Sequence, residues 1–141
     1  MNMIFEPFVG LGMLKFGMDK AEAESLLGKI TGVGNSIFED GKLTAFSVYP
    51  DDIDSLIISG DEIAKMDRLS AALNLAYQSG NYGQAQGGSL YFMDLGCAIL
   101  QFESPSREFF FFSRGYDTGE PLKEMSPDSI ETYYEENNWD D

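Results

Sequence analysis

The sequence contains no histidine, a single cysteine and only nine lysine and arginine residues among 141. The absence of histidine removes the commonest general base, the usual catalytic triads and most zinc sites. The single cysteine, Cys97, excludes an intrachain disulfide, and its apolar neighbours predict a buried, inert thiol. The shortage of basic side chains argues against nucleic-acid binding, because phosphate backbones are held by Lys and Arg.

Long hydrophobic runs are also missing. No segment approaches the roughly 20 apolar residues of a membrane span, and the N-terminus lacks the basic and apolar stretches of a signal peptide. We therefore expect a cytoplasmic protein that makes no membrane contact. With 43% hydrophobic and 13% aromatic residues, 141 residues are enough for one globular domain over positions 1–141.

Motifs for cofactors, phosphates and metals are incomplete. The glycines at positions 10–12 and 32–34 do not complete GxGxxG, and no phosphate-binding P-loop occurs. Asp51, Asp52 and Asp54 begin like a calcium loop, but the next two required positions hold leucine and isoleucine, so an EF-hand is excluded. A weak divalent-cation site there remains an alternative to a solvated turn. We expect no enzyme activity, no cofactor and no metal.

Two helices are predicted, at about 19–28 and 60–79. In the first, Asp19 and Glu22 have the spacing of a capping box, and Gly28 has the position of a left-handed terminating residue. In the second, Ser59 and Glu62 repeat the capping-box spacing before an apolar helical pattern that ends near position 80.

The remaining segments predict strands and turns. Asp40-Gly41 separates two strand-like segments, at 37–39 and 43–49, and favours a tight hairpin. Further strands are expected at 56–58, 90–94, 97–103 and 108–113, with a flexible loop at 80–89. The grouping of strands and helices favours an α+β fold with a mainly antiparallel sheet.

Four consecutive phenylalanines occupy positions 109–112. Neighbouring side chains of a strand point to opposite faces, so both faces of this strand must be covered. One interpretation is a central strand covered by the rest of the chain. The alternative is that one face contributes to a partner or dimer interface.

The segment 117–141 is acidic and aromatic. From position 115 to the end, nine acidic residues accompany one basic residue, Lys123, for a net charge of −8 out of −15. Ser126 or Pro127 can open a final helical turn. Aromatic side chains surrounded by charge are typical of an interface hot spot, whereas the alternative is a tyrosine that packs back on the sheet.

Residues 12–28 read GMLKFGMDKAEAESLLG, and residues 112–116 read FSRGY. The first segment resembles a phrase near the start of small bacterial proteins, several of which are immunity proteins of contact-dependent or polymorphic toxin systems. The second resembles a closing strand of such proteins. The resemblance implies a soluble protein that neutralises one cognate toxin, and it transfers no site residues.

The acidic composition and this resemblance together predict an immunity protein that blocks the active site of a basic, nuclease-like toxin domain. The chain is expected to be a monomer, with its oligomeric state left open. Two alternatives remain: a small-ligand-binding or regulatory domain with a pocket between the Phe-rich sheet and the second helix, and a secretion chaperone for a basic effector. The predicted partner contacts are the acidic turn and the aromatic tail: Asp51, Asp52, Asp54, Glu131, Tyr133, Tyr134, Glu135, Glu136 and Trp139.

Overall fold

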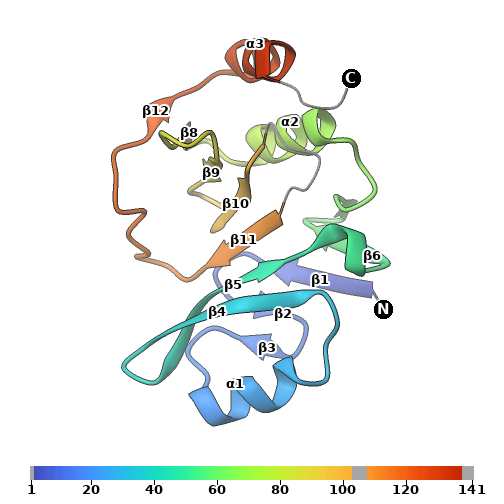
Figure 1. Ribbon diagram of the computed structural model, residues 1–141, viewed down its shortest axis with the longest axis vertical. Helices are drawn as coiled ribbons and strands as arrows, with labels where there is room; N and C mark the ends of the chain where they lie inside the picture. Colours follow the sequence, from blue (N-terminus) through green and yellow to red (C-terminus); the bar gives the residue numbers. More distant parts are fainter. Residues whose placement is uncertain (1, 103–107, 138–141) are drawn as a thin grey trace.

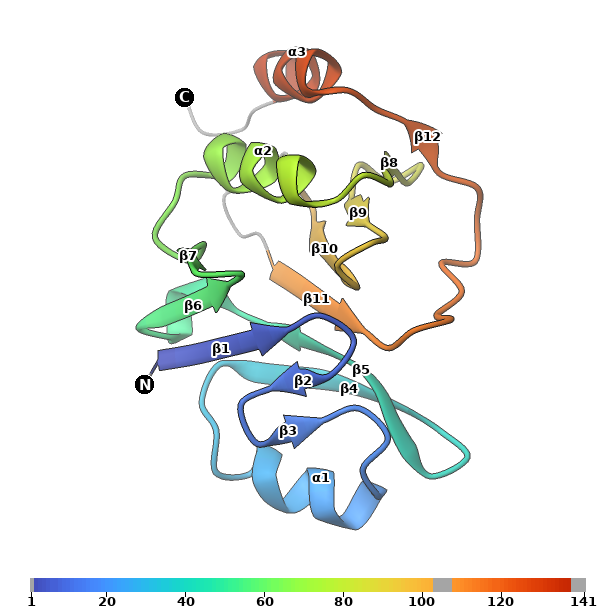
Figure 2. The same ribbon diagram turned by 180° about the vertical axis from the view of Figure 1, so that it is seen from behind.

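The computed structural model describes residues 2–102 and 108–137, and within them the chain forms an α+β fold of two sheets and three α-helices. Helix α1 (Lys20–Leu27) lies at one end of the molecule, and α2 (Arg68–Gln78) and α3 (Pro127–Asn137) lie at the other (Figures 1 and 2). A 3-10 turn, η1 (Pro50–Asp52), connects the two sheets. The predicted fold class is confirmed. No helix in these ranges is both long enough and apolar enough to cross a membrane.

The smaller sheet has the strand order β3-β2-β1-β6-β7. Its strands are β1 (Asn2–Glu6), β2 (Gly10–Leu11), β3 (Leu14–Lys15), β6 (Ser55–Ile58) and β7 (Asp61–Glu62). Strand β1 occupies the centre and pairs with β6 in parallel, whereas the other pairs are antiparallel. This sheet therefore joins the start of the chain to a strand about fifty residues later.

The larger sheet is antiparallel and has the order β12-β8-β9-β10-β11-β5-β4. Its strands are β4 (Val33–Glu39), β5 (Lys42–Val48), β8 (Tyr82–Gln84), β9 (Leu90–Phe92), β10 (Cys97–Leu100), β11 (Glu108–Phe112) and β12 (Lys123–Glu124). The predicted hairpin is confirmed: Asp40 and Gly41 adopt φ values of 53° and 75°, the left-handed pair that a two-residue turn requires. The strands expected from positions 56, 90, 97 and 108 also form, and position 103 lies outside the described residues.

The predicted flexible loop at 80–89 is wrong in part, because it contains β8. This strand pairs with β9 on one side and with β12 on the other. Gly83 permits the second pairing, since a Cβ atom there would lie 2.8 Å from the Leu122 Cβ and 2.9 Å from the Lys123 carbonyl oxygen. The polar, glycine-rich composition thus serves close strand contact as well as turns.

Helix α1 forms as predicted, but its two end signals act differently. Asp19 is the N-cap, yet its side chain makes no cap hydrogen bond and pairs instead with the Lys42 ammonium across the neighbouring hairpin. Gly28 ends the helix with φ −66° and ψ −13°, a right-handed conformation, so the expected left-handed termination is wrong. Its amide still donates to the Glu24 carbonyl at 3.1 Å.

Helix α2 begins later than predicted. Its N-cap is Asp67, whose carboxylate accepts a 2.8 Å hydrogen bond from the Ser70 amide. Ser59 lies in the turn between β6 and β7 with φ 53°. The Glu62 carboxylate accepts from the Leu56 and Ala64 amides at 3.2 and 2.8 Å, so it stabilises a strand turn and not a helix start. Strand pairing therefore takes the place of the expected capping box.

The phenylalanine strand lies inside the larger sheet, between β10 and β5. Phe109 and Phe111 belong to the main core, and Phe110 and Phe112 pack on the opposite face with Ala45 and Ala98. Tyr116 covers this second face, with its ring centroid 5.5 Å from Phe110 and 5.0 Å from Phe112. The interpretation as a central strand covered on both faces is confirmed, and so is the burial of Cys97.

Candidate partner-binding surface and groove at helix α3

Helix α3 starts with a reciprocal pair of hydrogen bonds. The Ser129 amide donates to the Ser126 hydroxyl at 3.2 Å, and the Ser126 amide donates to the Ser129 hydroxyl at 2.7 Å. Pro127 follows the cap, where its missing N–H leaves no helix hydrogen bond unmade. The sequence predicted a single helical turn, and this start instead begins a helix of 11 residues.

The inner face of α3 packs on α2 and the larger sheet. Ile130 is fully buried, and the Tyr133 and Tyr134 rings lie 6.1 and 5.8 Å from the ring of Phe102. The guanidinium of the buried Arg68, at the start of α2, lies 5.3 Å from the Tyr134 ring centroid. Both tyrosines are half-buried, and their rings pack between α3 and the rest of the protein.

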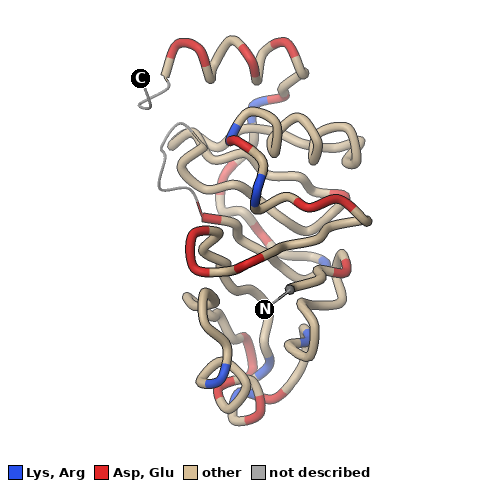
Figure 3. The backbone as a smooth tube through the Cα atoms, turned by 90° about the vertical axis from the view of Figure 1, so that its right-hand side faces the viewer, with Lys and Arg blue, Asp and Glu red and all other residues tan. Residues whose placement is uncertain are grey.

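The outer face of α3 is acidic. Asp128, Glu131 and Glu135 are exposed and follow one another at spacings of three and four residues, which places them on one side of the helix. Glu136 is also exposed, on the neighbouring side. Figure 3 shows the acidic positions recurring along this helix. We call Asp128, Glu131 and Glu135 the acidic stripe.

The acidic stripe as a row of like charges does not stabilise α3. Like charges three or four residues apart repel each other by about 0.2–0.5 kcal/mol per pair. Glu135 also lies in the last turn, which contains no basic residue, and negative charge is unfavourable at the C-terminal end of a helix dipole. Helix stability therefore accounts for Asp128, which lies in the first turn where negative charge is favourable, but not for Glu135.

Charge is unevenly distributed along the chain and in space. Residues 1–50, which include α1, carry six acidic and four basic side chains, whereas residues 51–141 carry 18 and five. Two of the four lysines in residues 1–50 form ion pairs. The Lys15 Nζ lies 3.7 Å from the Glu6 Oε1, and the Lys42 ammonium pairs with the Asp19 carboxylate. The excess of negative charge thus lies in residues 51–141, which include most of η1 and all of β6, β7, α2 and α3.

The two groups of predicted contacts do not form one surface. Asp51, Asp52 and Asp54 are exposed at and after η1, immediately before β6. Strand β6 lies at mid-height beside β1, whereas α3 lies beyond α2 at the end of the molecule (Figures 1 and 2). Within residues 2–102 and 108–137, no group of three acidic or cysteine side chains could hold a metal ion. Trp139 lies outside the described residues.

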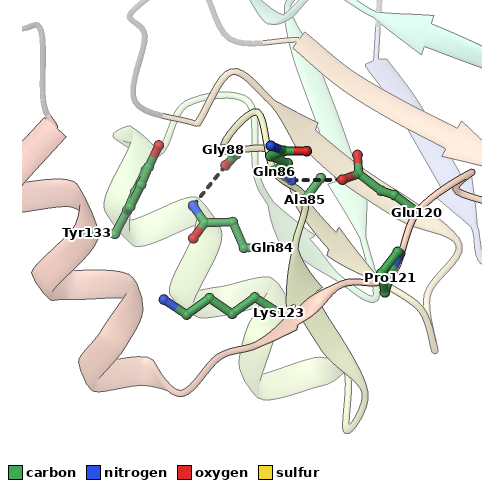
Figure 4. A pocket seen from close by; sticks show the side chains of 8 residues that line it. All are labelled: Gln84, Ala85, Gln86, Gly88, Glu120, Pro121, Lys123 and Tyr133. Atoms are coloured by element: carbon green, nitrogen blue, oxygen red, sulfur yellow. Dashed lines mark hydrogen bonds between the residues drawn. The ribbon is translucent and has the colours of Figure 1, made fainter.

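A groove follows the neighbouring side of α3, and the sequence did not predict it. It consists of two hollows of about 390 and 230 Å³ that share Gln84, Lys123 and Tyr133. Figure 4 shows the larger of these two hollows. Gln84 and Lys123 are directly opposite each other in the β8–β12 pair, so their side chains project on the same face of the sheet. Three segments far apart in the sequence build the groove, and no local pattern marks it.

The pocket expected between the Phe-rich strand and the second helix is filled by side chains. The α2 residues Ala72 and Leu75 belong to the same buried core as Phe109 and Phe111. No family model, curated protein or solved structure matches this chain. The class that the structure defines is thus an α+β domain of two sheets, with the acidic helix α3 and the groove beside it as its candidate site.

Proposed function

We propose that the protein is an immunity-type inhibitor that binds a basic toxin domain through the acidic stripe of α3. The observation that carries the proposal is a row of exposed carboxylates on a helix that Ile130, Tyr133 and Tyr134 fix to the body of the protein. A fixed row of charges loses little conformational entropy on binding, which favours affinity.

The electrostatics of the chain support a basic partner. A net charge of −15 accelerates encounter with a positively charged protein and makes the association rate sensitive to salt. The stripe presents carboxylates about 4.5 and 6 Å apart along the helix axis, from the 1.5 Å rise per residue. A nuclease cleft that holds successive phosphates offers several cations at similar separations, so the stripe would occupy that cleft and exclude the nucleic acid.

The test is capture of the partner from lysate of the protein's own cells at low salt, with stepwise salt elution and mass spectrometry. We expect one basic protein whose activity, measured on the purified partner, the wild-type chain inhibits. The variant Glu131→Lys/Glu135→Lys should lose both capture and inhibition. A matched control, Glu22→Lys/Glu24→Lys, makes the same charge change on exposed positions of α1 and should keep both.

Loss of capture in both variants would show that only net charge matters, and retention in both would remove α3 from the mechanism. A secretion chaperone would bind the unfolded partner in preference to the folded one, so both forms should be compared. If no basic protein is retained, the inhibitor proposal fails. The groove beside α3 favours a second candidate function, the binding of a small ligand.

A further inference from the structure

The groove between α3 and the β8–β12 pair contains a lysine that has no counter-ion in the part of the chain that the structure describes. Lys123 is the only basic residue between positions 115 and 141, and Glu120 and Glu136 line the same groove. No carboxylate of the described residues lies within ion-pair distance of its ammonium group. Figure 4 shows the Lys123 side chain extending toward α3. In the most acidic part of the chain, this ammonium remains available to a ligand.

A second polar group beside Lys123 is also available. Gln84 is only 8% exposed, and its Nε2 donates to the Gly88 carbonyl oxygen at 3.1 Å. This bond fixes the orientation of the amide and leaves Oε1, which has no donor among the described residues, as an acceptor in the groove (Figure 4). The groove thus offers a cation and an adjacent fixed acceptor.

The carboxylates of the groove have different partners. One oxygen of Glu120 accepts a hydrogen bond from the Gln86 amide at 3.1 Å, which anchors this side chain to the loop after β8. Glu136 is exposed at the other hollow, one helical turn from Thr132. An anion of high charge would be repelled by these groups and by the net charge of −15, and a simple cation would meet Lys123.

The ligand that satisfies every group carries both charges. A carboxylate would pair with Lys123, and a cationic side chain would reach Glu136 or Glu120 while its aliphatic stem packs against the Tyr133 ring. That ring lies against Phe102 at an interplanar angle of 23°, so it is fixed in place as one wall. The Gln84 Oε1 would accept an N–H from the ligand backbone.

We propose that this groove binds an α-carboxylate next to a cationic side chain, the chemistry of a free basic amino acid or of a polypeptide that ends in Arg or Lys. This site goes beyond the proposed function, since it lies on the side of α3 next to the acidic stripe and contains none of the three stripe residues. Its failure leaves the inhibitor proposal standing, and the reverse also holds.

The experiment is calorimetric titration of the full chain with four probes at low salt. They are N-acetyl-Gly-Arg with a free carboxylate, its C-terminal amide, N-acetyl-Gly-norleucine with a free carboxylate, and free arginine. We expect the first probe to bind and the amide and norleucine probes to bind at least about tenfold more weakly, because each lacks one charge-assisted contact. Free arginine binding as tightly as the peptide identifies a free amino acid as the source, and weaker binding identifies a chain end.

Three variants test the role of Lys123. Lys123→Gln should remove the difference between the free acid and the amide, and Lys123→Arg should retain it. Lys65→Gln makes the same charge change at an exposed position outside the groove and should behave as wild type. Absence of binding of the free acid to the wild-type chain, or equal binding of the amide, overturns the proposal.

Discussion

Replacing Ile130 by alanine tests whether α3 is an integral part of the fold. Ile130 is the one fully buried side chain that the structure describes in this helix. The change removes three carbon atoms, and at about 0.8 kcal/mol for each buried methylene the lost transfer free energy is about 2.4 kcal/mol. A residual cavity adds to this, so we expect the free energy of unfolding to fall by about 3 kcal/mol.

The change is large compared with a total stability of about 5–15 kcal/mol for a typical domain. At about 2–4 °C per kcal/mol for a chain of this size, the melting temperature should fall by about 6–12 °C. Urea and thermal denaturation, followed by circular dichroism, measure it, with Thr132→Ala on the exposed side of α3 as the control. An unchanged main transition, preceded by separate loss of helix signal, would refute the reasoning and make α3 an appendage.

Three further predictions concern charges and the thiol. Replacing both Glu131 and Glu135 by Gln should raise stability by about 0.5–1 kcal/mol at low salt, because repulsion and an unfavourable helix-dipole contact are removed, and a lower melting temperature would contradict this. Burial alone would raise the pKa of Glu62, but hydrogen bonds from backbone amides and from the Ser55 side chain outweigh it and lower the pKa below the ordinary 4.5. Its stabilising contribution is therefore present above pH 4.5 and lost as the pH falls through the folded value, so Glu62→Gln should flatten the acid side of the stability profile; an unchanged profile argues against these bonds. Complete burial raises the pKa of Cys97, so a thiol reagent should react only as fast as the protein opens, and rapid reaction of the folded protein would contradict its burial.

The elements that the sequence predicted well are those determined by local chemistry. Asp40-Gly41 specifies a hairpin within two residues, and the structure has it. The predicted start of α2 was wrong because the sequence contains two possible N-caps. Two residue pairs have the spacing of a helix cap: Ser59 with Glu62, and Asp67 with Ser70. Because β6 pairs with β1 and β7, Ser59 and Glu62 lie in a turn between strands, and only Asp67 caps the helix. That choice depends on contacts with a strand about fifty residues earlier in the sequence.

The candidate site shows the same division. The spacing of Glu131 and Glu135 is visible in the sequence, but the length of α3 depends on Phe102 and α2, against which its inner face packs. The groove could not be predicted, because Gln84 and Lys123 become neighbours only when β12 pairs with β8. In the sequence Lys123 is a single basic residue among acidic ones, and only the β8–β12 pairing shows that it lies beside Gln84.

The central place of β1 in the smaller sheet has a consequence during synthesis. Its parallel partner β6 begins at Ser55, so at about 5–20 residues per second the ribosome delivers that strand roughly 3–10 s after β1. Until then only the two-residue β2 is present of the two strands that flank β1, and Phe5 has neither β6 nor the Phe111 ring that it later packs against. In the nascent chain, one edge of β1 thus stays unpaired for several seconds. During that time β1 is a binding site for a chaperone that recognises short apolar segments.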